Sequence, residues 1–260
     1  MPSTLIFICI AAAVLITSFI SGILGMAGGM ILMGVLLALL PLPAAMMLHG
    51  ITQMAANGWR AWLWRAHVNW RVFRGYGVGA LLALAVFIAL QFVVSKPVAY
   101  ILLGITPFVS LVLPKRLALN VDHRGHPLVC GMVCTGLQLL AGVSGPLLDV
   151  FFVRSAMDRR GVVATKAMSQ TLGHLIKIFY FGGLSAMTGG ALGLSVETGL
   201  SLPLVAACVA LAFTGTSLSR RVLDKMSDTN FRLWTQWTVM TMGLLYLAAG
   251  LWMVAAPGRV

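Results

Sequence analysis

Apolar runs of roughly 20 residues recur along the whole chain, and each is long enough to cross the hydrocarbon core of a bilayer. Of the 260 residues, 60% are hydrophobic and only 9% are charged, whereas soluble domains carry about 25% charged residues. Lipid must therefore cover most of the surface. The runs are too long and too uniformly apolar for barrel strands, so they predict helices. We expect an all-α polytopic membrane protein in which residues 1–260 form a single transmembrane domain.

The expected membrane segments include two that are broken by short glycine-containing stretches, at Met26–Gly29 and at Gly142–Pro146. Glycine and proline at such positions end one helix and allow another to begin. The predicted segments are Thr4–Gly25, Met30–Leu40, Ala44–Trp64, Val72–Val94, Val98–Leu113, Pro127–Ala141, Leu147–Val153, Val162–Phe181, Leu194–Phe213 and Phe231–Val254.

The net charge of +12 is carried by basic clusters in the short loops, at residues 65–74, 115–124, 154–160 and 220–232. Such clusters mark the cytoplasmic side of a membrane protein, so nucleic acid is not expected as a partner. Fewer residues separate His126 from Arg154 than the roughly 40 that two crossings need. This segment is therefore expected to be a re-entrant hairpin, and Thr4–Leu40 to enter and return from the periplasm. A bacterial inner-membrane location with a periplasmic C-terminus follows.

The two halves of the chain match at a shift of 117 residues, mainly at polar positions. Gly28 falls on Gly145 and Gln53 falls on Gln170 at this shift. We expect two inverted repeats, at about residues 3–113 and 127–255, joined by a cytoplasmic linker at 114–126. Each repeat would be a broken, re-entrant helix hairpin followed by about three transmembrane helices, a common plan in secondary transporters.

Matched polar stripes follow the two breaks on the helices expected at Ala44–Trp64 and Val162–Phe181. Their spacing of four, four and three residues puts each stripe on one helical face. A polar face must avoid lipid, so it lines a cavity or holds the helix bundle together by hydrogen bonds. Two matched stripes favour a substrate path. They are His49, Gln53, Asn57 and Arg60 in the first half, and Lys166, Gln170, His174 and Lys177 in the second.

The sign of the embedded charge indicates what such a path carries. Arg60 and Lys177 are cations within the stripes, and Asp149 is the one clearly embedded acid. A positive cavity favours an anion, and the planar guanidinium of Arg60 suits a carboxylate, sulfonate or sulfite. The competing interpretation is that Arg60, close to Trp59, Trp62 and Trp64, extends to the cytoplasmic interface.

The helices expected to restart at Met30 and Leu147 would expose backbone N–H groups with a positive dipole end, which is a ready site for an anion. With no Cys/His spacing typical of a metal site, neither a metal nor a cofactor is expected. The predicted substrate-binding residues are Gly28, Gly29, Thr52, Gln53, Asn57, Arg60, Ser144, Gly145, Ser169, Gln170, His174 and Lys177.

Asp149 follows the second break by one turn. It could form an ion pair with Lys177 or His174, or it could carry a proton. Protons are therefore expected as a second partner of the transporter, with Asp149 or His174 as the coupling residue.

These motifs resemble those of the TauE/SafE sulfite exporter family. The likeness rests on Gly22-x-x-Gly25-x-x-Gly28-Gly29, on the following helix with its Gln-Asn stripe, and on the half-chain repeat, from Ser3 to Val254. Met26-Ala27, Pro146 and Asp149 depart from the family pattern. The resemblance implies proton-coupled transport, by export or uptake, of sulfite, a sulfonate or a related carboxylate.

Three other kinds of protein remain as alternatives. Gly142-Val143-Ser144-Gly145 resembles the nucleophile motif of intramembrane serine proteases, with His174 as a base. In the repeat, however, Ser144 falls on Ala27, so no enzyme is expected. An anion channel, or a structural subunit without transport of its own, is equally compatible with the composition. A homodimer is a further possible partner.

Overall fold

The computed structural model describes residues 4–24, 26–112, 119–187, 200–223 and 228–256. These residues form α-helices and one short 3₁₀ helix and contain no strand, which confirms the all-α prediction. Residues 114–118 of the expected linker lie outside them. The helices are α1 (Thr4–Leu24), α2 (Ala27–Leu39), α3 (Leu42–Leu63), η1 (Arg65–His67), α4 (Trp70–Leu90), α5 (Lys96–Val112), α6 (His126–Ala141), α7 (Gly145–Phe152), α8 (Arg159–Met187), α9 (Leu202–Leu223) and α10 (Asp228–Ala255).

Four helices of the described residues are long and apolar enough to cross a membrane: α1, α4, α9 and α10. Helices α3 and α8, with 22 and 29 residues, are also long enough. Their polar stripes lower their hydropathy, and the two helices pack against each other.

Helix ends follow local chemistry. Prolines occupy the first turns of α3, α6 and α7, where a missing N–H leaves no hydrogen bond unmade. The side chain of Asn69 caps α4 by accepting a hydrogen bond from the Val72 N–H at 3.2 Å. Gly142 ends α6 with φ +83°, a left-handed conformation that glycine adopts without steric cost. Helices α2 and α7 begin at Ala27 and Gly145, two or three residues before the predicted starts.

Helices α6 and α7 form the hairpin that the spacing of the basic clusters predicts. The segment before α6 is hydrogen-bonded to the last turn of α7 and to the residues that follow it. Val121 N–H donates to the Phe151 carbonyl at 3.1 Å, and the Asn120 amide donates to the Arg154 carbonyl at 3.0 Å. The chain therefore leaves this hairpin beside the point where it entered.

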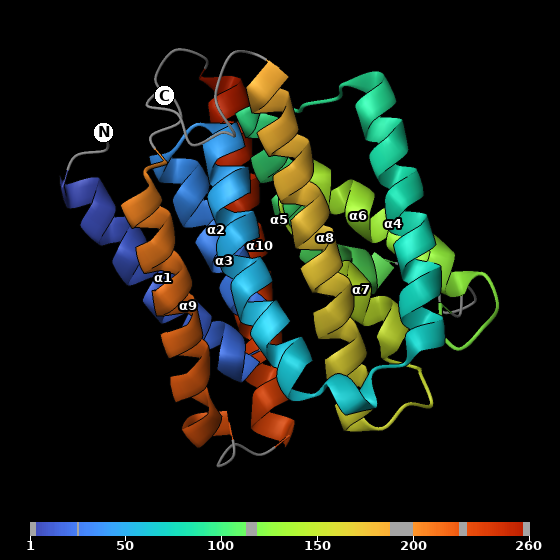
Figure 1. Cartoon of the computed structure of the whole chain (residues 1–260). Coiled ribbons are helices and arrows are strands. Elements are labelled where there is room, and N and C mark those ends of the chain that lie inside the picture. The colour runs from blue at the N-terminus through green and yellow to red at the C-terminus, as the bar shows by residue number, and fades with distance from the viewer. Residues whose placement is uncertain (1–3, 25, 113–118, 188–199, 224–227, 257–260) are drawn as a thin grey trace.

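The helices pack in four main pairs: α1 with α9, α4 with α6, α3 with α8, and α5 with α10. Figure 1 shows α3 and α8 side by side, running in opposite directions, and α4 likewise running opposite to α9. The broken segments α1–α2 and α6–α7 are thus covered from outside by α9 and α4, while α3 and α8 meet at the centre.

Glycine permits the close approach of two of these pairs. A Cβ at Gly79 of α4 would overlap the Leu128 carbonyl of α6, and one at Gly131 of α6 would overlap the Tyr76 carbonyl of α4. On the other side, a Cβ at Gly215 of α9 would lie 2.6 Å from the Leu15 carbonyl of α1. Small residues at such contacts are typical of helices that associate in lipid.

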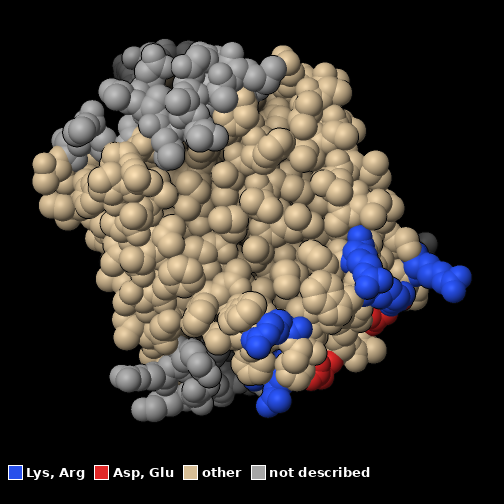
Figure 2. Space-filling model, viewed as in Figure 1, with Lys and Arg blue, Asp and Glu red and all other residues tan. Residues whose placement is uncertain are grey.

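The surface fits a bilayer environment. Large apolar side chains are exposed on the outer helices, among them Leu5, Val86, Leu218 and Trp237. In Figure 2 the visible Lys and Arg residues gather at the end of the molecule where α3 ends and α8 begins, and the middle is free of charge. This distribution is that of a multi-pass membrane protein with one basic end.

Candidate functional site

A small cavity lies where the two broken segments meet the polar faces of α3 and α8. It offers about 20 Å³ to the centres of water molecules, which is room for about one water. None of the described residues around it is acidic. The lining residues are Ser21, Met26, Gly29, Met30, His49, Gln53, Asn57, Gln138, Val143, Ser144, Gly145, Pro146, Gln170 and His174.

Most of this lining consists of positions that match between the two halves of the chain. The shift of 117 residues that relates the polar stripes also relates five pairs of lining residues to one another. These pairs are Ser21 and Gln138, Met26 and Val143, Gly29 and Pro146, Gln53 and Gln170, and Asn57 and His174. Each half of the chain therefore supplies an equivalent part of the wall.

The N-terminal turns of α2 and α7 both reach the cavity, through Gly29 and through Gly145 and Pro146. Neither helix has a side-chain cap at its start. The first N–H groups of an α-helix have no partner within the helix and carry a partial positive charge. Both helix ends are therefore suited to an anion in the cavity.

Gln53 provides an unused hydrogen-bond donor in this wall. Its side chain is 3% exposed, and its Nε2 is buried without a hydrogen-bond partner among the described residues. A buried amide donor without a partner costs about 1–3 kcal/mol. The amide lies against the start of α2, since a Cβ at Gly29 would be 3.3 Å from Gln53 Oε1.

His49 and Lys177 form a buried chain of hydrogen bonds between the two breaks. His49 Nε2 lies 2.8 Å from the Gly29 carbonyl, and Lys177 Nζ lies 2.7 Å from His49 Nδ1. Lys177 Nζ also donates to the Gly142 carbonyl at 2.9 Å. Both side chains are fully buried, and no carboxylate of the described residues contacts Lys177.

Ser144, Gln138 and His174 form a second chain on the opposite wall. The Ser144 hydroxyl donates to Gln138 Oε1 at 2.8 Å, and Gln138 Nε2 lies 3.0 Å from His174 Nδ1. The Gln138 amide thus separates the serine from the histidine. The rings of His174 and His49 are 5.5 Å apart, so the two chains meet at the cavity.

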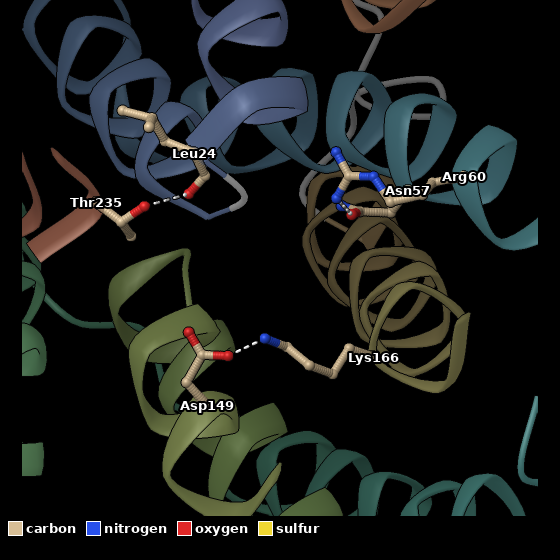
Figure 3. A network of polar contacts seen from close by, with 6 residues as sticks. All are labelled: Leu24, Asn57, Arg60, Asp149, Lys166 and Thr235. Carbon is tan, nitrogen blue, oxygen red and sulfur yellow. Dashed lines mark hydrogen bonds and ion pairs between the residues drawn. The ribbon is translucent and has the colours of Figure 1, made fainter. Parts of the chain in front are cut away.

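Arg60 reaches toward the cavity rather than toward the tryptophans of its own helix. Its guanidinium donates to the Ser21 carbonyl at 3.2 Å and to Asn57 Oδ1 at 3.4 Å, and both partners line the cavity. Figure 3 shows the contact with Asn57. These described hydrogen bonds join Arg60 to the cavity wall.

Asp149 of α7 forms an ion pair with Lys166 of α8, as Figure 3 shows. The partners considered from the sequence, Lys177 and His174, are instead engaged with His49 and Gln138. Both members of the ion pair are partly exposed, and neither lines the cavity.

The predicted binding residues divide into three groups. Gly29, Gln53, Asn57, Ser144, Gly145, Gln170 and His174 line the cavity, whereas Arg60 and Lys177 contact residues that do. Three others lie elsewhere. Gly28 packs against α1, Thr52 donates to the Leu48 and His49 carbonyls of its own helix, and Ser169 is buried away from the cavity.

Three polar residues of the lining lie outside the predicted set: Ser21, His49 and Gln138. His49 belongs to the first polar stripe but had no role beyond it. Gln138 stands out in the sequence as an amide within an apolar run, and the shift of 117 places it opposite Ser21. Applying the shift of 117 residues to the helices before the two breaks, as well as to the polar helices, identifies Ser21 and Gln138.

The fold and the cavity together define a multi-pass membrane protein with a polar, acid-free site at the centre of its helices. A family model for the sulfite exporter TauE/SafE matches residues 10–255, and the chain belongs to this family. Neither a curated protein nor a solved structure matches it. Family membership makes the chain a membrane transporter and agrees with the resemblance noted in the sequence.

Proposed function

We propose that the chain is a secondary transporter of a small sulfur anion, such as sulfite or an organosulfonate, or of a related carboxylate. The central cavity is the proposed binding site. The observation behind this proposal is Nε2 of Gln53, a buried hydrogen-bond donor in the cavity wall that has no acceptor among the described residues. An anion oxygen would supply that acceptor, and hydrogen bonds to charged groups contribute about 1.5–3 kcal/mol.

The electrostatics of the site supports an anion over a cation. The cavity wall has no carboxylate among the described residues, and two uncapped helix N-termini reach it. Arg60 contacts two lining residues, and Lys177 contacts a third, His49. All of these groups present positive charge or N–H donors, which favour a bound anion.

The arrangement of the helices supports two inverted repeats, at about residues 3–113 and 127–255. If α1 to α5 correspond to α6 to α10, the contact of α1 with α9 corresponds to that of α6 with α4. Helices α3 and α8, and likewise α5 and α10, then contact their own counterparts. The opposite directions of α3 and α8 in Figure 1 are those of an inverted relation.

Inverted repeats around a central site support a carrier over a channel, because one repeat can move against the other to open each side in turn. A cavity with room for about one water also excludes sulfite in this conformation. Binding therefore requires the walls to separate, as a carrier's alternating cycle does.

The hydrogen bonds of Ser144 weigh against the protease alternative. Its hydroxyl donates to the Gln138 amide rather than to His174. An amide oxygen accepts a hydrogen bond but does not take up a proton at neutral pH, so it does not activate a nucleophile. We therefore propose no enzymatic role for this pair.

The membrane orientation is also a proposal. The basic end in Figure 2 would face the cytoplasm of a bacterial inner membrane. Helix α10 ends at the opposite end in Figure 1, which supports a periplasmic C-terminal side. Coupling to protons and assembly as a homodimer stay predictions at this level.

The test replaces the unpaired donor without changing its size much. We expect Gln53→Leu to weaken sulfite binding and transport by roughly 10–100-fold, the equivalent of one hydrogen bond to a charged group. Thr171→Val is the control, since Thr171 lies outside the cavity and donates to the Ala167 carbonyl of its own helix. The measurement is saturable uptake of radiolabelled sulfite by proteoliposomes. Equal uptake by Gln53→Leu and wild type would contradict the proposed site.

A further inference from the structure

Lys177 is a buried basic group that contacts no carboxylate of the described residues. Its side chain is 0% exposed, and its described contacts are His49 Nδ1 and the Gly142 carbonyl. A buried ammonium without a counter-charge is costly, by several kcal/mol even after relaxation of its surroundings. Something must offset that cost whenever the amine is protonated.

His49 is held in the one orientation that makes it a proton partner for Lys177. The Gly29 carbonyl can only accept a hydrogen bond, so His49 Nε2 carries a hydrogen and donates to it. In the neutral ring this leaves the Nδ1 lone pair facing Lys177 Nζ at 2.7 Å. One added proton can then reside on Lys177 or on His49 Nδ1, shared across a single hydrogen bond.

The His49–Lys177 pair reaches the cavity through His49. The His49 side chain lines the cavity, and Lys177, which does not, contacts the Nδ1 atom of its ring. From α8, His174 faces the pair, with its ring 5.5 Å from that of His49. Helix α2 and the α6–α7 break contribute the Gly29 and Gly142 carbonyls, which do not titrate. Asp149 and Lys166 are paired with each other instead.

We propose that His49 and Lys177 form a proton-binding site that takes up one proton when an anion enters the cavity. This inference rests on the proposed anion-transport function and names the groups that couple it to protons. The added proton places a positive charge on the pair, and the anion beside His49 supplies the missing counter-charge. By linkage, each ligand increases the affinity for the other by the same factor.

The sign of this coupling has a consequence for transport. Anion and proton bind together, so they cross the membrane in the same direction. For a monovalent anion with one proton the cycle is electroneutral, and its direction follows the combined gradients of the two. The bridge from Gly29 to Gly142 also ties the two breaks together, so its charge state can change as they separate.

The test measures proton uptake during binding of methanesulfonate, a sulfonate that does not itself take up a proton near neutral pH. Titration calorimetry of the purified protein in buffers of different ionisation enthalpy gives the number of protons bound per anion. We expect a value approaching one for the wild type. Binding without proton uptake would overturn the coupling proposal and leave the anion site intact. Absence of binding would contradict the anion site itself, and the coupling with it.

Two variants assign the proton to the pair. His49→Gln and Lys177→Gln keep a hydrogen-bonding side chain but cannot bind the proton, so the uptake should fall toward zero while methanesulfonate still binds, more weakly. Lys166→Gln is the matched control on the same helix and should keep the wild-type uptake. Unchanged uptake in both His49→Gln and Lys177→Gln would overturn the assignment. Wild-type calorimetry decides the coupling even where a variant fails to fold.

Discussion

At the scale of single residues, the site is organised by what each polar group lacks. Within the part of the chain that the structure describes, Gln53 Nε2 has no acceptor and Lys177 contacts no carboxylate, and both side chains are buried. Asp149, the acid that the sequence marks as a coupling candidate, already has its partner in Lys166. Missing partners at a polar cavity indicate a ligand, whereas a satisfied pair indicates a structural role.

Asp149→Asn tests this distinction. Because the ion pair with Lys166 is partly exposed, its loss should lower the free energy of unfolding by no more than about 1 kcal/mol. The number of protons taken up per anion should stay at the wild-type value, since we assign the proton to His49 and Lys177. Titration calorimetry with methanesulfonate in buffers of different ionisation enthalpy measures this number. A loss of proton uptake in Asp149→Asn would return the coupling role to Asp149.

At the scale of helices, the bundle is held by close contacts at glycine, and each of the segments α1–α2 and α6–α7 contains a break. Gly79 and Gly131 let the backbones of α4 and α6 approach, and Gly215 does the same for α9 against α1. Gly142 turns the chain at the end of α6 and presents its carbonyl to Lys177. The glycines thus position the site without contributing side chains to it.

Alanine substitutions at two glycines of α4 distinguish the effect of close packing on stability from the effect of helix propensity. Gly79→Ala should lower the free energy of unfolding by about 1–3 kcal/mol, because the new methyl overlaps the Leu128 carbonyl and a backbone atom cannot rotate away. Gly77→Ala meets only Leu172 Cδ2 at 3.6 Å, an ordinary contact, so stability should be unchanged or slightly raised. Thermal unfolding in detergent compares the two. Equal midpoints would refute the close α4–α6 contact.

At the scale of the whole molecule, the two ends of the bundle differ in charge, and the α6–α7 hairpin begins and ends at one of them. Arg124 lies just before that hairpin, and Ser95 lies in the connection between α4 and α5. Both residues are exposed. If the basic end is cytoplasmic, these two positions lie on opposite sides of the membrane.

Cysteine labelling tests this orientation. A thiol reagent that does not cross membranes should label Ser95→Cys in intact cells and should label Arg124→Cys only after the cells are permeabilised. The native cysteines are a small background, since Cys130, Cys134 and Cys208 are buried. Replacing the exposed Cys9 by Ala removes the remaining one. Labelling of both positions from the same side would rule out the proposed topology.

The sequence by itself determined the membrane class, the α-helical fold, the two breaks and half of the residues that line the cavity. These depend on composition, spacing and glycine or proline positions, which act locally along the chain. Seven of the twelve predicted binding residues line the cavity. Spacing predicts which face of a helix a residue lies on. Because α3 and α8 pack against each other, residues on their facing polar sides line the cavity.

Only the tertiary structure decided which polar groups meet. Asp149 pairs with Lys166, His49 joins Lys177, and Gln138 separates Ser144 from His174. These contacts join residues from different helices, and their distances depend on how closely the helices approach and how each is rotated. A sequence pattern fixes the face of a helix, but the packing of backbones at glycine contacts sets the partner that each face touches.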